Sequence, residues 1–216
     1  MTDETIKTQV VDQLFWDSRV DAADVGVTVK KGGVTLKGVV PSYQAKSAGL
    51  WDAYLVRGVT FVDNQLTVKY PKVPTDDKIK EYVGNVLMWD MNLDSSNITV
   101  LVDGGIVKLT GTTKSYWEKS LAEEDSYRVG GVIDVTNELG IVLSGSWTDE
   151  RVAKDIESAI ERNFNVEVND VDVKVSEGTV TLSGVVPNWT ARYAAYECAR
   201  YTSGVFEVKN ELTIGW

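Results

Sequence analysis

The sequence predicts an α/β (α+β) fold class in the form of three tandem α-β-β-α-β domains, each a three-stranded sheet packed against two helices. Three observations predict it. The chain aligns with itself without a gap at an offset of 73 residues, as from Gly32 to Gly105 and from Gly105 to Gly178. Within each copy, apolar residues first recur at a spacing of four and then alternate with polar residues, as in a helix followed by strands. Glycines stand where the turns are expected.

We expect domains at residues 2–70, 75–143 and 148–216, which we call repeats 1, 2 and 3. Three columns of the alignment contain glycine alone. These structural glycines are Gly32, Gly38, Gly58, Gly105, Gly111, Gly131, Gly178, Gly184 and Gly204. Because glycine makes up about 7% of an average chain, three such columns are not expected by chance.

The first element of each copy is predicted to be a helix, at about residues 3–16 in repeat 1. Ile6, Val10 and Leu14 follow one another at a spacing of four, which stacks them on one helical face. Thr2 precedes an acidic pair, so the helix has an N-cap residue and negative charge beside the positive end of its dipole.

The second element is predicted to be a β-hairpin. Val25 and Val27 alternate with polar residues, and Val34 and Leu36 do the same after Gly32. A tight turn between the two strands requires a positive φ angle, which glycine adopts without a steric penalty.

A second helix and a third strand complete the copy. Ser42 stands at an N-cap position, and the helix runs to about residue 56 with small side chains such as Gly49 facing inward. Gly58 ends this helix, and residues 59–69 form a strand. The strand order of the sheet stays open at this stage.

Two segments of each copy carry a resemblance to a known family. The hairpin segments are Gly32–Gly38, Gly105–Gly111 and Gly178–Gly184, and the glycine-to-strand segments are Gly58–Asn64, Gly131–Asn137 and Gly204–Asn210. With the order α-β-β-α-β, they resemble the BON domain, named for bacterial osmotically induced and nodulation proteins. The resemblance implies a non-catalytic stress and envelope module associated with phospholipid interfaces and protein assemblies, one branch of which binds potassium. The commonest family pattern differs, with two copies behind an export signal.

Composition excludes several classes of protein. The formal net charge of −10 and the isoelectric point near 4.6 make this acidic chain a poor partner for nucleic acid. The chain has no histidine and one cysteine, Cys198, so we expect no enzyme, no catalytic residues, no cofactor and no metal site. No transmembrane segment is expected, because no stretch approaches about 18 apolar residues. The start lacks the pattern of a leader, which predicts a cytoplasmic location, or a periplasmic one if an export signal was removed.

The candidate contact residues are Phe15, Trp16, Met88 and Trp89, at the ends of the first helices of repeats 1 and 2. Repeat 3 has Glu161-Arg162 instead. On a helical wheel, position 16 points away from the buried stripe that ends at position 14. Exposed rings there could insert at a lipid headgroup boundary or grip a protein partner. The alternative is that they pack against the neighbouring repeat.

Other residue types allow two interpretations each. The column Tyr43, Tyr116 and Trp189 is either a repeated ligand platform or a ring that packs at the start of the second helix. Acidic residues such as Asp94 could hold a hard cation, or could line solvated loops. Glu123-Glu124-Asp125 has the pattern of a solvated helix face, and Cys198, aligned with Asp52 and Asp125, occupies a position that tolerates charge.

The sequence therefore predicts a non-enzymatic binding or scaffolding protein of the bacterial osmotic or envelope stress response. Its partner would be a protein or a phospholipid surface, contacted by several weak sites in one chain. The alternative is a protein that senses a small ligand or a monovalent cation such as potassium.

Overall fold

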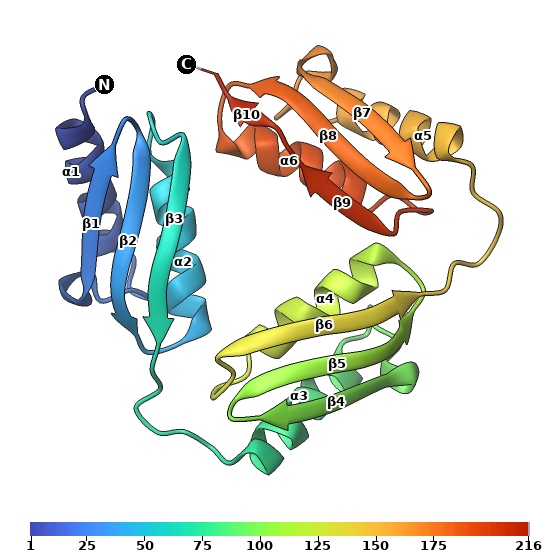
Figure 1. Cartoon of the computed structure of the whole chain (residues 1–216), viewed down its shortest axis with the longest axis horizontal. Coiled ribbons are helices and arrows are strands. Elements are labelled where there is room, and N and C mark those ends of the chain that lie inside the picture. The colour runs from blue at the N-terminus through green and yellow to red at the C-terminus, as the bar shows by residue number, and fades with distance from the viewer. Residues whose placement is uncertain (216) are drawn as a thin grey trace. The chain divides into compact units, whose positions relative to one another are not determined.

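The computed structural model describes residues 1–215, and it confirms the predicted fold class. Each repeat has two long helices and a sheet of three strands, with both helices on one face of the sheet (Figure 1). In repeat 3 the third strand is broken into two pieces that pair with the same neighbour. The exact domain boundaries stay a prediction.

The elements follow the same order in each repeat. Repeat 1 contains α1 (Asp3–Trp16), β1 (Val25–Lys30), β2 (Gly33–Val40), α2 (Tyr43–Leu55) and β3 (Phe61–Val68). Repeat 2 contains α3 (Asp76–Trp89), β4 (Ile98–Asp103), β5 (Ile106–Thr113), α4 (Tyr116–Tyr127) and β6 (Asp134–Ile141). Repeat 3 contains α5 (Asp149–Glu161), β7 (Val171–Ser176), β8 (Thr179–Val186), α6 (Trp189–Arg200), β9 (Glu207–Asn210) and β10 (Thr213–Ile214). A short 3-10 turn precedes the first strand of each sheet, at Ala22–Asp24, Ser95–Asn97 and Val168–Asp170.

The strand order, which the sequence left open, is β1-β2-β3. The hairpin strands β1 and β2 are antiparallel, with Val25 opposite Gly38. β3 pairs with β2 in parallel, with Val34 opposite Val62. A parallel pair requires a crossover connection, and α2 supplies it. The central strand is therefore β2, which the α2 crossover connects to its parallel partner.

The core of repeat 1 lies between the two helices and the sheet. Ile6, Val10 and Leu14 of α1 are all at most 2% exposed, as their spacing predicts. α2 lies close to the sheet because its inward side chains are small. A methyl group added at Gly49 would lie 3.3 Å from Cδ1 of Leu66 on β3.

The hairpin turn has the backbone conformation that the sequence predicts. Lys31 has φ 52° and Gly32 has φ 75°. A Cβ atom at Gly32 would lie only 2.7 Å from the carbonyl oxygen of Gly58. Glycine is therefore required at this column for both conformation and space, and no ligand is needed to explain it.

The first acidic residue of each first helix binds this turn, which the sequence did not reveal. The Asp3 carboxylate accepts hydrogen bonds from the backbone N–H groups of Lys31, at 2.8 Å, and Gly32, at 3.0 Å. These bonds lower the pKa of Asp3. Asp76 accepts the equivalent pair of bonds from Gly104 and Gly105, and Asp149 accepts it from Glu177 and Gly178. The same carboxylate thus ties the start of the helix to the hairpin in every repeat.

A repeated asparagine ties the second helix to the third strand. Nδ2 of Asn64 donates to the carbonyl oxygen of Lys46 at 3.0 Å, and Oδ1 of Asn64 accepts from the N–H group of Leu66 at 3.2 Å. Asn137 and Asn210 make the same two bonds in their repeats. The conserved length of the repeats is therefore matched by conserved internal bonds.

Candidate functional site

The predicted contact residues lie on the surface at the ends of α1 and α3. Phe15 is 68% exposed and Trp16 80%, and Met88 is 62% exposed and Trp89 77%. We call these groups of exposed apolar side chains the apolar tips of repeats 1 and 2. The rings of Phe15 and Trp16 meet edge to face, with their centroids 5.4 Å apart.

The exposure of the tips follows from helical geometry. Leu14 is the last buried residue of the stripe on α1, at 1% exposure, and successive residues turn by about 100° around the helix axis. Phe15 and Trp16 therefore point away from the core. Such a concentration of large apolar surface at one helix end is what a contact site requires, and the residues stay candidates for that role.

Two further residues of the same kind were not predicted from the sequence. Met91 is 98% exposed and Phe164 is 94% exposed. They occupy one alignment column with Ser18, in the segment that follows the first helix. Repeat 3 therefore has an apolar tip as well, at Phe164, although Glu161-Arg162 replaces its helical part. The alignment of the repeats could have revealed this column.

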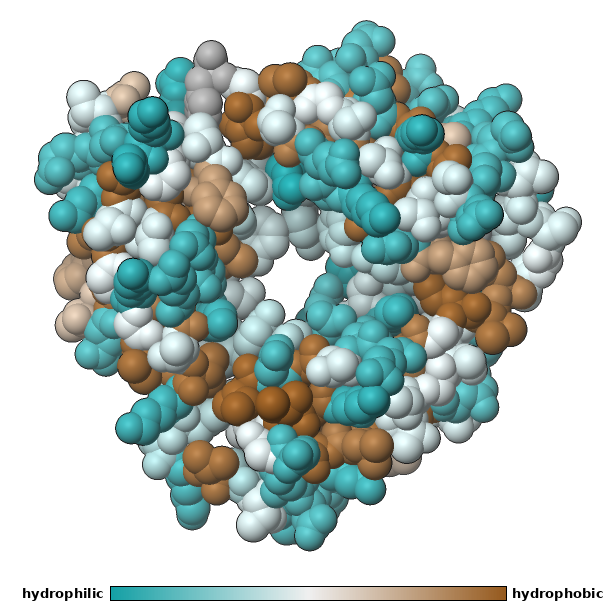
Figure 2. Space-filling model, viewed as in Figure 1, coloured by the Kyte–Doolittle hydropathy of each residue, from teal (hydrophilic) through white to brown (hydrophobic). Residues whose placement is uncertain are grey.

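Apolar surface is not confined to the tips. On the face drawn in Figure 2, hydrophobic side chains form patches among hydrophilic ones in each repeat. Leu101 on β4 is 49% exposed and Val185 on β8 is 57% exposed. The tips of repeats 1 and 2 differ from these positions in combining two or more large side chains, each more than 60% exposed, within a few residues.

The aromatic column at the start of the second helices is half-buried. Tyr43, Tyr116 and Trp189 are the first residues of α2, α4 and α6. The guanidinium carbon of Arg192 lies 4.8 Å from the centre of the Trp189 ring. These positions favour the packing interpretation over a repeated ligand platform.

The loop carboxylates bind donors of their own repeat. Asp94 accepts from Nζ of Lys114 at 2.7 Å and from Oγ of Ser96 at 2.6 Å. The bond from Lys114 is the main reason why the pKa of Asp94 falls to about 2. Asp90 accepts from the N–H group of Asn92 in the same manner. Within residues 1–215, no group of three or more histidine, cysteine, aspartate or glutamate side chains could hold a metal ion. The monovalent cation stays a prediction.

The column Asp52, Asp125 and Cys198, interpreted as a position that tolerates charge, is not at the surface. Asp52 is 4% exposed and Asp125 is 1% exposed. For the same reason Asp125 is not part of a solvated helix face, although its neighbour Glu124 is exposed. Each of the side chains in this column is partly or fully buried on the second helix.

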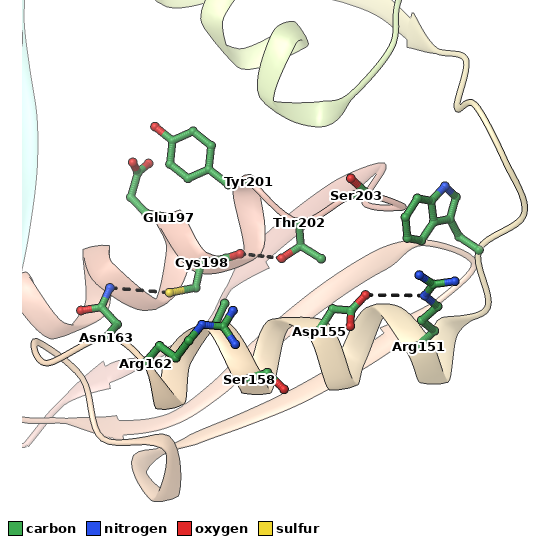
Figure 3. Close-up of a pocket in the computed structure, with 12 residues that line it drawn as sticks. Arg151, Asp155, Ser158, Arg162, Asn163, Glu197, Cys198, Tyr201, Thr202 and Ser203 are labelled. Atoms are coloured by element: carbon green, nitrogen blue, oxygen red, sulfur yellow. Dashed lines mark hydrogen bonds and ion pairs between the residues drawn. The ribbon is translucent and has the colours of Figure 1, made fainter.

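Cys198 lies in a groove between α5 and α6 of repeat 3 (Figure 3). The groove has a volume of about 730 Å³. Nδ2 of Asn163 lies 3.6 Å from the Cys198 sulfur, and burial raises the pKa of the thiol. A protonated thiol beside an amide is not an activated nucleophile. Two of the acidic side chains that line the groove are paired with arginines, Asp155 with Arg151 at 3.8 Å and Glu197 with Arg200 at 3.2 Å.

None of the helices between residues 1 and 215 combines the length and hydropathy that a membrane span requires.

The sequence is similar to a known domain family and to a protein of Escherichia coli. The family model of the BON domain matches residues 2–70, 75–142 and 148–215. Osmotically-inducible protein Y of Escherichia coli K12 is 29% identical over 148 residues, which cover 64% of this chain and 72% of that protein.

Two solved structures of CdsD, a structural protein of the type III secretion system of Chlamydia trachomatis, were also found. The first is 16% identical, covers 96% of this chain and 91% of its own, and gives a TM-score of 0.27. The second, of the C-terminal domain, is 16% identical with full coverage of both chains and the same TM-score of 0.27.

Proposed function

Because this chain belongs to the BON-domain family, with three copies of the domain, we propose that it is a non-enzymatic binding protein of the bacterial osmotic stress response. The similarity to an osmotically-inducible protein supports the stress response. The absence of histidine and the protonated state of the Cys198 thiol support a role without catalysis.

The observation that carries the binding role is the exposure of the apolar tips. A tryptophan that is 77–80% exposed at a helix end has an apolar body and a polar N–H group, which suits it to the boundary between lipid headgroups and acyl chains. The last turns of α1 and α3 contain no basic residue, so the helix ends at these two tips have no positive charge that would select anionic lipids. We therefore expect a phospholipid surface with neutral headgroups to be the partner, and a protein with an apolar patch is the alternative.

Three tips in one chain would act together. Each tip alone would bind weakly, but once one has bound, the others are held near the same surface at a high effective concentration. The connecting segments, residues 71–74 and 144–147, are short enough to keep that concentration high.

The test is to remove both tryptophans. We expect Trp16→Ala combined with Trp89→Ala to reduce the fraction bound to phosphatidylcholine vesicles at least about tenfold, because each ring contributes roughly 1.5–3 kcal/mol when it leaves water. The free energy of unfolding should change by less than about 0.5 kcal/mol, since the rings are exposed. Flotation of vesicles and thermal unfolding measure the two quantities.

A matched control is Phe61→Ala. Phe61 is 58% exposed and pairs with Gly33 beside the hairpin turn, at the start of β3 and not in a tip. It should leave vesicle binding unchanged. Unchanged binding by the double variant together with a large loss of stability would show instead that the rings pack against a neighbouring repeat. If the wild-type chain binds neither neutral vesicles nor vesicles that contain phosphatidylglycerol, the lipid surface is wrong.

A further inference from the structure

Repeat 1 buries a carboxyl group where the end of α1 meets α2. Asp52, near the end of α2, is 4% exposed. Among residues 1–215, its Oδ2 atom is buried and has no hydrogen-bond partner. The side chain lies within hydrogen-bonding reach of two others, Gln13 on α1 and Asp17, the C-cap residue of α1. A buried acid therefore stands beside a second acid.

Asp17 has donors of its own and keeps its negative charge. Its carboxylate accepts from the backbone N–H group of Arg19 at 2.8 Å and from Nε of Arg19 at 3.0 Å. These bonds hold the pKa of Asp17 down at about 2. The guanidinium of Arg19 is directed to Asp17, and its side chain is 63% exposed, so it acts on Asp52 only through its charge. The charged groups that act on Asp52 are thus Asp17 and Arg19, and Gln13 is its neutral neighbour.

Binding of a proton to Asp52 would remove the unfavourable energy of burying its negative charge beside Asp17. Gln13 offers Asp52 one hydrogen bond, but a buried carboxylate oxygen that has no donor, such as Oδ2, is costly, and a second carboxylate next to it adds repulsion. Protonated Asp52 has no charge, and its O–H group can donate to the Asp17 carboxylate. In agreement, burial and then the charge of Asp17 raise the pKa of Asp52 to about 6.

The residues at and around the aligned positions differ in the other two repeats. In repeat 2 the aligned residues are Asp90 and Asp125, and Nη1 of Arg128 donates to Oδ1 of Asp125. In repeat 1 the position of Arg128 is occupied by Leu55, which has no donor to offer.

In repeat 3 the aligned residues are neutral. They are Asn163 and Cys198, and the amide of Asn163 is directed at the thiol (Figure 3). The buried acid of repeat 2 is thus paired with an arginine, and repeat 3 has two neutral residues at these positions. In repeat 1 the buried acid lies beside a second acid and has no cation bound to it.

We propose that Asp17 and Asp52 of repeat 1 form a proton-binding site, and that the bound proton holds the end of α1 against α2. Loss of the proton leaves two negative charges at this junction and loosens it. Because Trp16 immediately precedes Asp17, the proton also determines how firmly the tip of repeat 1 is held. That last consequence rests on the proposed function, whereas the proton site does not.

The direction of the pH dependence follows from the pKa shifts of Asp52 and Asp17. The folded-state pKa of Asp52 lies above its unfolded value, so its stabilising contribution is complete below about pH 4 and is lost as the pH rises through about 6. Asp17 has the opposite shift, and its contribution is lost as the pH falls from about 4 to about 2. Between about pH 4 and pH 7, the change in stability at this junction therefore comes from Asp52.

The direct test is an NMR titration of the side-chain carboxyl carbons in the full chain. We expect the Asp52 resonance to titrate with a midpoint near pH 6, and a midpoint near the ordinary value of about 4 would overturn the proposal. Asp17→Asn is the matched variant, because it recreates the asparagine of repeat 3, whose amide can donate to the buried group. In that variant the midpoint of Asp52 should move down toward 4.

A second measurement follows the consequence for the fold. Asp52→Asn replaces the protonated acid by a neutral group of the same shape. At pH 7.5 we expect the buried amides of α1 to exchange their hydrogens roughly tenfold more slowly than in the wild type, and the wild-type loss of protection between pH 4 and pH 7 to disappear. Asp12→Asn, an exposed acid on the same helix, should leave that pH dependence intact. A pH dependence that survives in Asp52→Asn would contradict the proton site, whatever the result of the vesicle experiment.

Discussion

Replacing Gly38 by alanine should unfold repeat 1 or bring it close to unfolding. Gly38 lies on β2 opposite Val25, with φ 149°. A Cβ atom there would lie 1.9 Å from the carbonyl oxygen of Asp24, which belongs to the backbone and cannot move aside as a side chain could. The strain of the φ angle and the displacement of the short 3-10 turn together should cost roughly 3–5 kcal/mol.

Hydrogen exchange measures this loss of stability separately for each repeat. The amide of Val10, in the buried stripe of α1, should exchange at least about a hundredfold faster in Gly38→Ala, since each 1.4 kcal/mol is a factor of ten. Amides of α5 in repeat 3 report on a repeat that the substitution does not touch.

Gly84→Ala is the control for the change from glycine to alanine. Gly84 lies within α3, and a Cβ atom there would meet nothing within 4 Å. Because alanine has the higher helix propensity, this variant should be more stable by about 0.5–1 kcal/mol. Normal exchange in Gly38→Ala would mean that β1 and β2 can separate at this point without cost, against the packing described above.

Most of the fold could be predicted because the signals are local and occur three times. The spacing of Ile6, Val10 and Leu14 fixes a helix and its buried face, and the predicted range, 3–16, matches α1 (Asp3–Trp16). The strand order could not be predicted, because the pairing of β2 with β3 joins segments almost thirty residues apart and leaves no local pattern. The break between β9 and β10 in repeat 3 also lacked a signal that the sequence analysis used.

The candidate site was predictable in part, because only some of its residues lie where a local sequence pattern predicts their exposure. Phe15 and Trp16 lie within a helix, where the period of 3.6 residues predicts their exposure. Met91 and Phe164 lie beyond the helices, where no period applies, and only the repeat alignment places them at the tips. The burial of Asp52 was missed because residue type alone predicts an exposed acid, whereas its position between α1 and α2 determines its environment.

Removing the carboxylate of Asp149 should weaken repeat 3 by about 2 kcal/mol. This carboxylate accepts from the N–H groups of Glu177 at 2.8 Å and Gly178 at 2.9 Å, 28 and 29 residues away. In Asp149→Ala both donors in the turn lose a charged partner, and hydrogen bonds to charged groups contribute about 1.5–3 kcal/mol each where water cannot replace them. Water reaches the turn in part, which is why we expect the total to lie near the value of one such bond.

The measurement separates this long-range bond from the general effect of negative charge at a helix start. Glu150→Ala removes the next acidic residue of the same first turn, which is exposed, and should cost no more than about 0.5 kcal/mol through the helix dipole. We therefore expect the unfolding transition of repeat 3 to fall by roughly 10 °C in Asp149→Ala and by no more than about 3 °C in Glu150→Ala. Equal effects would mean that the carboxylate acts only through the dipole. A larger effect for Asp149 would show that the bond between the helix start and the hairpin turn, present in all three repeats, is a principal link between helix and sheet.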